Sequence, residues 1–520
     1  MGFALKKPEG TPGAAWPAIC IGLFVAFGGV LFGYDTGTIG GILAMPYWIS
    51  TFATEGRTEI TPAEDSLTVS ILSAGTFFGA LLSAPCADIL GRRWGIFASC
   101  AIVFNLGVIL QTASTSQPLF IAGRCIAGLG VGLISAMIPL YQSETSPKWI
   151  RGTVVGAYQL AITIGLLLAA IVNNATALRN DSASYRIPIA VQFLWSLIIC
   201  GGLLLLPETP RFLIKQDKHE QAAKALSVLR RLDVTHPALV EELSEIEANH
   251  RYEMSLEKAS YLDCFRGNIG KRLLTGCLLQ GLQQLTGQLH LLLRHPVFPK
   301  RWIRRSVHHL CHHELRKRIL DIPRTLSGRE ARSQESPATR SIGHGSITGT
   351  VAGTTDRAAQ QAAIAFVCIY IYFFASTWGP VAWVVTGEIF PLKVRAKCLS
   401  MTSATNWLLN FAIAYATPYM VRDGPGYANL QSKVFFIWGG CCFICIIFTW
   451  FLIYETKGLS LEQVDELYQT VNKAWQSKKF RPQISFHEVS DIKNDGRAMS
   501  LAEMGAEVQR KKSVGHEENL

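Results

Sequence analysis

The sequence predicts an all-α membrane protein. Of its 520 residues, 49% are hydrophobic and only 17% are charged, against about 25% charged residues in an average soluble domain. The apolar residues are grouped in runs of roughly 20, the length that a helix needs to cross the hydrocarbon core of a bilayer. The 13 cysteines lie mostly inside these runs, where they fit as small apolar side chains. These observations exclude a soluble enzyme, a disordered chain and a secreted disulfide-linked domain, and we expect no enzymatic activity.

Six apolar runs are predicted to cross the membrane before a long polar stretch. Residues 1–11 are polar, and the first run is too long for the core of a signal peptide, so we expect no cleaved leader. Residues 1–13 are then a cytosolic segment, and residues 14–206 form a six-helix bundle. Its runs cover approximately residues 14–34, 67–87, 94–112, 118–141, 153–173 and 188–206.

A polar stretch over residues 207–271 is predicted to be a cytosolic linker. Within it, His219–Arg231 and Ala238–Arg251 combine helical periodicity with mixed charges, which is typical of short surface helices. Residues 272–454 are expected to form a second bundle, and residues 455–520 a polar cytosolic tail. The apolar runs of the second bundle cover residues 272–293, 362–386, 399–420 and 434–454.

Basic residues beside the apolar runs set the predicted orientation. Loops that stay in the cytosol carry an excess of lysine and arginine, so both termini are expected there. The formal net charge of +11 could suggest a nucleic-acid partner, but a membrane protein explains charges at loop positions better, and we expect no nucleic-acid partner. The orienting residues are Arg92, Arg93, Lys148, Arg151, Lys393, Arg395 and Lys397.

Nine short strings occur along the chain in a recognisable order. They are GGVLFGYDTG (28–37), DILGRR (88–93), GRCIAGLGVG (123–132), YQSETSPKWIRG (141–152), PETPRFL (207–213), LQQLTG (282–287), WGPVAWVVTGEIFPLKVR (378–395), NWLLNF (406–411) and YETKG (454–458). With these strings the chain resembles the sugar porter family of the major facilitator superfamily, and within it the fungal hexose transporters. The last string departs from the family's PETKG at its first residue.

The resemblance implies a major facilitator fold, which has two six-helix bundles in the family, here with helices seven to nine disrupted. It implies transport of a hexose by alternating access, with glucose as the expected substrate. We expect a monomer in the lipid bilayer of the plasma membrane, with a monosaccharide as its partner. Protons are the expected coupling ion, and we expect no other cofactor and no metal ion.

Asp35 lies inside an apolar predicted helix, where a carboxylate is costly and usually marks a proton or ion path. Arg124, in the fourth run, is the natural partner, and proton symporters of the resembled family have the same pair. A deprotonated Asp35 pairs with Arg124 and a protonated one releases it, which gives helix packing two states. The alternative is that Asp35 only caps a helix break at Gly33–Gly37. Some facilitative relatives also keep this aspartate, which leaves the coupling open.

Amide side chains and tryptophans are expected to form the sugar site. A sugar presents hydroxyl groups and a weakly apolar face, so its site needs groups that both donate and accept hydrogen bonds beside an aromatic wall. By resemblance, these residues bind the hexose at the midplane between the halves, and Gly379–Pro380 breaks the tenth family helix so that the wall can move. The alternative is that the amides only hold helices together. The candidates are Gln159, Gln283, Gln284 and Asn406, with Trp383 and Trp407 as the wall.

Charged residues gather at the predicted cytosolic ends of the helices. By resemblance they form ion pairs that lock the outward-open state, whereas the residues alone would favour a solvated fringe of basic loops. The set is Asp88, Arg92, Arg93, Glu144, Arg151, Glu208, Arg211, Glu388 and Arg395.

Residues 288–346 do not fit the family pattern. Between Arg294 and Arg340 the chain holds 12 Lys/Arg against four Asp/Glu, a balance of +8 within the total of +11, and five of the 12 histidines. A frame shift accounts for this composition. With codon boundaries moved by one base, Gln288–His295 permits NFIFYYG and Glu314–Pro337 permits NCVNVFSTFPGLYLVEKLGRKNLL, as the family has there. We therefore predict two compensating insertions or deletions, or a misplaced exon boundary, and family-like sequence returns near Gly349.

Other interpretations stay open. The histidines and Cys311 of the aberrant segment could suggest zinc, and its arginines RNA, but neither has supporting context such as a second ligand pair at metal spacing. The protein could be a sugar sensor, although sensors of this kind typically carry a very long cytosolic tail and here 62 residues (520 − 458) follow Gly458. It could also be an inactive product, because the asparagine and paired tyrosines expected after Gln284 are missing.

Overall fold

The computed structural model describes residues 13–52, 61–255, 260–287 and 369–480, apart from short gaps at residues 15, 148, 371–372, 375–376, 392–393, 422–426, 431–432, 457–460 and 472. Every regular element within these ranges is a helix. The aberrant segment 288–346 and most of the predicted run 362–386 lie outside the described residues, and so does the tail beyond residue 480.

The N-terminal half consists of the helices that account for the first six predicted runs. The first run continues to Ile42 with an interruption of the helix at Phe27, and the third contains a π-helical stretch. The elements are α1 (Trp16–Ala26), α2 (Gly28–Ile42), α3 (Pro46–Phe52), α4 (Pro62–Leu90), α5 (Arg92–Ala98), the π-helix η1 (Ser99–Phe104), α6 (Asn105–Ala113), α7 (Gln117–Thr145), α8 (Arg151–Thr176) and α9 (Ala183–Leu203).

The linker and the C-terminal half follow. Both predicted linker helices are present as α11 and α12. The elements are α10 (Pro210–Lys215), α11 (His219–Arg230), α12 (Pro237–Ser255), the 3-10 helix η2 (Leu262–Phe265), α13 (Gly267–Gly287), α18 (Trp378–Glu388), α19 (Arg395–Val421), α20 (Val434–Leu452), α21 (Leu461–Thr470) and the 3-10 helix η5 (Ala474–Lys479).

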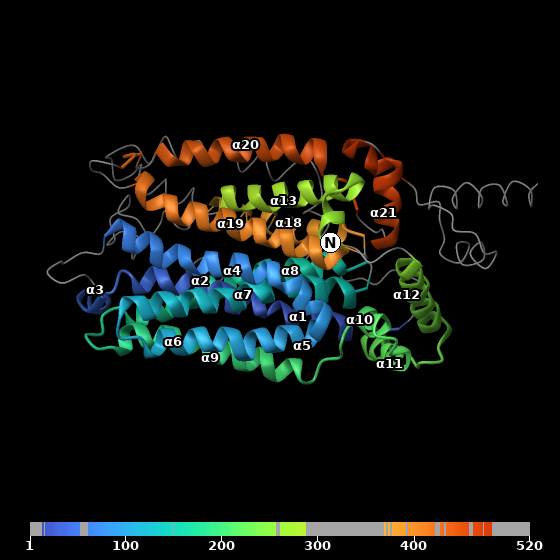
Figure 1. Cartoon of the computed structure of the whole chain (residues 1–520), viewed down its shortest axis with the longest axis horizontal. Coiled ribbons are helices and arrows are strands. Elements are labelled where there is room, and N and C mark those ends of the chain that lie inside the picture. The colour runs from blue at the N-terminus through green and yellow to red at the C-terminus, as the bar shows by residue number, and fades with distance from the viewer. Residues whose placement is uncertain are drawn as a thin grey trace, which may run out of the picture.

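The long helices lie side by side in two groups (Figure 1). One group holds the N-terminal helices, and the other holds α13, α18, α19 and α20. Helices α10, α11, α12 and α21 lie together at one end of the molecule, which we call the linker end, and α3 lies at the opposite, far end. The molecule therefore has two helical halves and two distinct ends.

The helices of the N-terminal half are long enough to cross a bilayer. Six segments among the described residues meet the length and hydropathy expected of a membrane span, and all six precede the linker. They run past the predicted borders, as α4 does at its start. There the Thr61 hydroxyl accepts from the Glu64 N–H at 3.3 Å, while the Glu64 carboxylate accepts from the Thr61 N–H at 2.9 Å. This reciprocal cap satisfies two N–H groups at the helix start and fixes where α4 begins.

The two halves share one apolar core. Helix α4 packs along α19 of the other half, and α8 packs against α18. Within the N-terminal half, α2 approaches α8 so closely that a Cβ at Gly33 would collide with the backbone of Ile162. Close packing at small residues is how membrane helices associate without a hydrophobic drive. The seam between the halves, mainly α4–α19 and α8–α18, is where the candidate site lies.

Candidate functional site

The predicted ion pair is present in the interior of the N-terminal half. Arg124 Nη1 on α7 lies 2.9 Å from Asp35 Oδ1 on α2, and the two side chains are 2% and 0% exposed. Gln192 on α9 donates a hydrogen bond from Nε2 to the same carboxylate oxygen at 3.3 Å. Three helices therefore meet at one carboxylate, which is more than a helix cap requires.

This cluster leaves several hydrogen-bonding atoms unused. Asp35 Oδ2, Arg124 Nε and Arg124 Nη2 are buried and have no hydrogen-bond partner among the described residues. A buried charge with unsatisfied hydrogen bonds is costly, and it is stabilised chiefly by its partner. The free oxygen Oδ2 is a position that can take up a proton, and doing so would weaken the attraction that holds α2 to α7.

A connected set of amides lies in the C-terminal half, on α13 and α19. Asn406 Nδ2 on α19 donates to Gln280 Oε1 at 2.7 Å and to Gln283 Oε1 at 2.9 Å, both on α13. Gln284 Nε2 donates to Asn406 Oδ1 at 2.8 Å. We call these four residues the amide cluster. Three of them were sequence candidates; Gln280 was not. Each amide can both donate and accept, so a ligand hydroxyl can replace any of these bonds.

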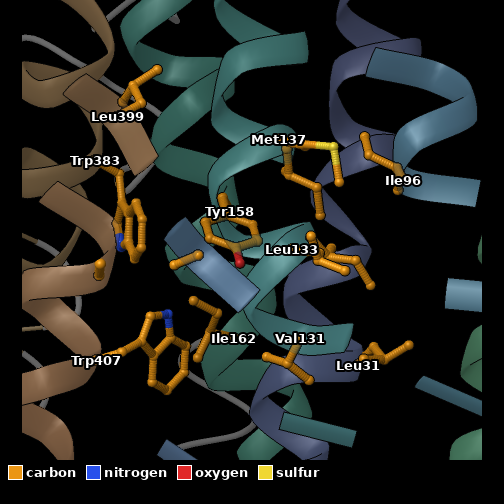
Figure 2. Packing of buried hydrophobic residues seen from close by; sticks show 14 of the residues in the cluster. Leu31, Ile96, Val131, Leu133, Met137, Tyr158, Ile162, Trp383, Leu399 and Trp407 are labelled. Carbon is orange, nitrogen blue, oxygen red and sulfur yellow. The ribbon is translucent and has the colours of Figure 1, made fainter. Parts of the chain in front are cut away.

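The tryptophans connect the amide cluster to the N-terminal half. Trp383 Nε1 on α18 donates to Gln159 Oε1 on α8 at 3.2 Å. Trp407 Nε1 on α19 donates to Ser135 Oγ on α7, also at 3.2 Å. Both indoles are almost fully buried, and Figure 2 shows them on the C-terminal side of the seam, with Tyr158 of α8 opposite. All six predicted sugar-site residues therefore lie at or beside the seam.

The aromatic wall is completed from the N-terminal half. The Tyr158 ring meets the Trp383 indole edge to face at 5.4 Å, and the Phe32 ring meets Trp407 at 4.8 Å. Edge-to-face pairs of this kind add to the stability of apolar packing. Tyr158 and Phe32 were not predicted, because an aromatic residue in an apolar run gives no signal that separates a site from a core.

Gly379 and Pro380 stand where α18 begins. The helix starts at Trp378, and Gly379 lets α8 approach, because a Cβ there would lie 3.0 Å from Gln159 Cγ. The Gly379 carbonyl accepts a hydrogen bond from Gln283 Nε2 at 2.6 Å. The break therefore brings a backbone acceptor into the amide cluster. Whether it also lets the wall move stays a prediction.

At the linker end, Arg92 and Glu208 carry the main charged contacts. Arg92 Nη2 lies 3.0 Å from Glu144 Oε1, and both side chains are nearly buried. Glu208 accepts hydrogen bonds from the backbone N–H groups of Arg92, Arg93 and Thr209. Burial raises the pKa of Glu208, and these N–H donors oppose that rise. The contacts tie α5 to α7 and to the start of the linker.

The other predicted charges have different contacts. Asp88 pairs with Lys215 of α10 at 2.8 Å on the surface. Glu388 accepts from the Thr456 hydroxyl at 2.7 Å, and Arg395 donates to the Phe390 carbonyl at 2.9 Å. Arg151 is buried, and both it and Arg211 make further interactions. Their role as a lock on one state stays a prediction.

Sequence reasoning missed one strong contact at the linker end. Arg272 of α13 lies 2.6 Å from Asp465 of α21, and its guanidinium stacks over the Tyr468 ring at 4.6 Å. The Arg272 side chain is 3% exposed and that of Asp465 is 23% exposed, so the arginine is shielded from water while its partner is partly exposed. In the sequence, Arg272 was noted only as the first residue of an apolar run. Its spacing to the tail gave no signal, because nearly 200 residues separate the partners.

A family model described as sugar (and other) transporter matches residues 21–297 and 339–468 of the chain. The chain is 58% identical to the major facilitator-type transporter ecdD of Aspergillus rugulosus, over 93% of each protein. It is 47% identical to the probable glucose transporter rco-3 of Neurospora crassa, over 94% of this chain and 85% of that protein. It is 39% identical to the high glucose sensor RGT2 of Saccharomyces cerevisiae, over 92% of this chain and 66% of the sensor.

Solved structures share the fold. The proton:xylose symporter XylE, bound to 6-bromo-6-deoxy-D-glucose, superposes with a TM-score of 0.74 at 24% identity, covering 88% of this chain and all of that one. The partially occluded inward-open form of XylE from E. coli gives a TM-score of 0.63 at 24% identity, covering 83% and 97%. These likenesses establish the major facilitator fold, in agreement with the fold class that the sequence predicts.

Proposed function

Because the chain belongs to the sugar porter family of the major facilitator superfamily, we propose that it carries a hexose across the plasma membrane by alternating access. The observation that carries the proposal is the amide cluster, which lies on the C-terminal side of the seam beside two indoles that donate hydrogen bonds across it. An arrangement of neutral donors and acceptors with an aromatic wall suits a sugar and does not suit an ion. Glucose is the proposed substrate, and a glucose transporter is among the relatives.

We propose further that transport is coupled to protons through Asp35 and Arg124. With Asp35 ionised, the contact of 2.9 Å between Arg124 Nη1 and Asp35 Oδ1 holds α2 against α7. With Asp35 protonated, the attraction is lost and the helices are free to adopt a second packing. Each cycle would then carry one proton and one sugar toward the cytosol, where both termini are proposed to lie.

Uptake of labelled glucose in a host without hexose transporters tests the proposal. Two chains are compared, the 520-residue chain and the chain translated from the confirmed transcript. Uptake by either, competed by unlabelled glucose and stimulated by an acidic exterior, is the expected result. Uptake by the transcript-derived chain alone would identify the 520-residue chain as an inactive product. If neither chain moves any hexose into cells or vesicles, with or without an acidic gradient, the proposed function is wrong.

A sensor is the second candidate, because one relative is a high glucose sensor at 39% identity. A sensor binds the hexose without moving it in quantity. Equilibrium binding of labelled glucose to purified protein, measured beside uptake, separates the two functions. Binding with saturable uptake means transport, whereas binding without uptake favours the sensor.

A further inference from the structure

Three serines line one face of α4 at the seam with the other half. Ser66, Ser70 and Ser73 are spaced four and three residues apart, so they share one face of the helix. They are 0%, 0% and 3% exposed. They lie in the part of α4 nearer its start, toward the far end of the molecule. Val69, beside them, packs against Ile413 and Ala414 of α19.

The last of these serines is joined to the amide cluster. Ser73 Oγ donates to Asn410 Oδ1 on α19 at 2.8 Å, across the two halves. Asn410 Nδ2 in turn donates to Gln284 Oε1 at 3.2 Å. A continuous polar track therefore runs from α4 into the amide cluster.

The other two serines differ from Ser73. The Ser66 and Ser70 hydroxyls are buried and have no hydrogen bond to any residue that the structure describes. Serines in a helix usually bond back to a carbonyl of the preceding turn, as Ser83 on the same helix does to the Ala80 carbonyl at 2.6 Å. A buried hydroxyl without a partner is destabilising, and an alanine would avoid that cost. These hydroxyls are therefore expected to act in a state where the seam is open.

We propose that Ser66, Ser70 and Ser73 form a second hexose subsite, which opens at the far end and passes the sugar to the amide cluster. The proposal rests on the proposed function, since it is the sugar's route to that site. Gln280, Gln283 and Asn406 of the amide cluster are buried, and Asn410 beside the cluster bonds to Ser73 across the seam, so a sugar reaches the cluster from this side only when α4 and α19 part. Parting frees three hydroxyls to bond with sugar hydroxyls, and uncovers Val69, Ile413 and Ala414 for its apolar face.

The test pairs serine substitutions with deoxy-glucose analogues. Ser66→Ala and Ser70→Ala are measured for uptake of glucose and of its singly deoxygenated analogues, in whichever of the two chains carries uptake. Each substitution is expected to raise the half-saturating glucose concentration about two- to tenfold, the effect of one hydrogen bond, with little change in maximal rate. One analogue lacks the hydroxyl that the substituted serine binds. The substitution should weaken the affinity for this analogue less than it weakens the affinity for the other analogues. Ser66→Thr and Ser70→Thr keep the hydroxyl and should restore the glucose value.

Ser83→Ala is the matched control, because Ser83 is also a buried serine of α4 but bonds within its own helix. It should leave the half-saturating concentration unchanged, with surface expression measured for all variants. The proposal is overturned if the relative affinities for glucose and its analogues are the same in Ser66→Ala and Ser70→Ala as in the parent. It is also overturned if Ser83→Ala raises the half-saturating glucose concentration as they do. Failure of the parent to take up or bind any hexose would instead overturn the proposed function, and this inference with it.

Discussion

Replacing Asp35 by asparagine should abolish uphill accumulation of hexose while sparing exchange. The change keeps the shape of the side chain but removes its charge, so Arg124 is left as a buried cation that cannot regain its partner. Removing one partner of a buried pair typically costs about 3–5 kcal/mol. Since 1.4 kcal/mol is a tenfold change in an equilibrium, the packing that depends on the pair is disfavoured by a factor of roughly 140 to 3,700. The variant is thus held near the state that protonation would produce.

The assay compares two activities in the same vesicles. Accumulation is the ratio of internal to external labelled glucose under an acidic exterior, and exchange is the loss of preloaded label to external unlabelled glucose. The Asp35→Asn variant should bring the accumulation ratio to one and keep most of the exchange rate, because exchange requires no change of protonation. Asp181→Asn is the matched control, since Asp181 also pairs with an arginine, Arg179, at 2.9 Å, but both side chains are about half exposed.

The two variants are expected to differ because the Asp35–Arg124 pair is buried and the Arg179–Asp181 pair is exposed. Water screens the exposed Arg179–Asp181 pair, so its loss should change neither activity measurably. Uphill uptake that is unchanged in Asp35→Asn would refute the coupling and make the protein a facilitator. A fall in exchange as large as the fall in accumulation would mean that Asp35 is only structural.

Three further predictions concern other parts of the chain. Arg92→Ala leaves the buried Glu144 carboxylate without its arginine and should shift the protein toward opening at the linker end. The opening would be measured as faster labelling of a cysteine placed at that end. Lys215→Ala removes an exposed ion pair and should leave the labelling rate unchanged. Asn406→Ala breaks three amide contacts and should raise the half-saturating glucose concentration at least tenfold, whereas Gln111→Ala, a buried amide away from the seam, should leave it unchanged. Sequencing the transcript across residues 287–349 should reveal the shifted frame, and an unshifted reading in confirmed RNA would retire that explanation.

The fold could be predicted from the sequence because hydropathy and charge act over short distances. Each apolar run of the N-terminal half is helical, and the two linker helices followed from periodicity and mixed charges. Exact ends were harder, since they depend on caps such as that between Thr61 and Glu64. The division of the chain into five segments stays a prediction, with its aberrant part outside the described residues.

The candidate site could be predicted only where a residue type is out of place in lipid or where the family resemblance marks a position. A carboxylate or an arginine in an apolar run is conspicuous, so Asp35 and Arg124 were found, and their contact follows from the fold. Gln192, Ser73 and Asn410 were missed, because a single neutral polar residue in a helix is common and its partners are remote in sequence. Such contacts arise from how α4, α9 and α19 are placed, which no local pattern encodes.

Helix α2 provides a physical link between the two proposed activities. Phe32 contacts Trp407 of the aromatic wall, and Asp35, one turn further along the same helix, pairs with Arg124. A helix moves as a unit over so short a distance, because successive turns share backbone hydrogen bonds. Any shift of α2 that follows protonation of Asp35 therefore displaces the ring that presses on Trp407. By the reciprocity of coupled sites, sugar at the wall must then change the proton affinity of Asp35 by the same factor as protonation changes sugar affinity. Proton coupling consequently requires sugar binding to depend on pH, and Asp35→Asn to remove that dependence.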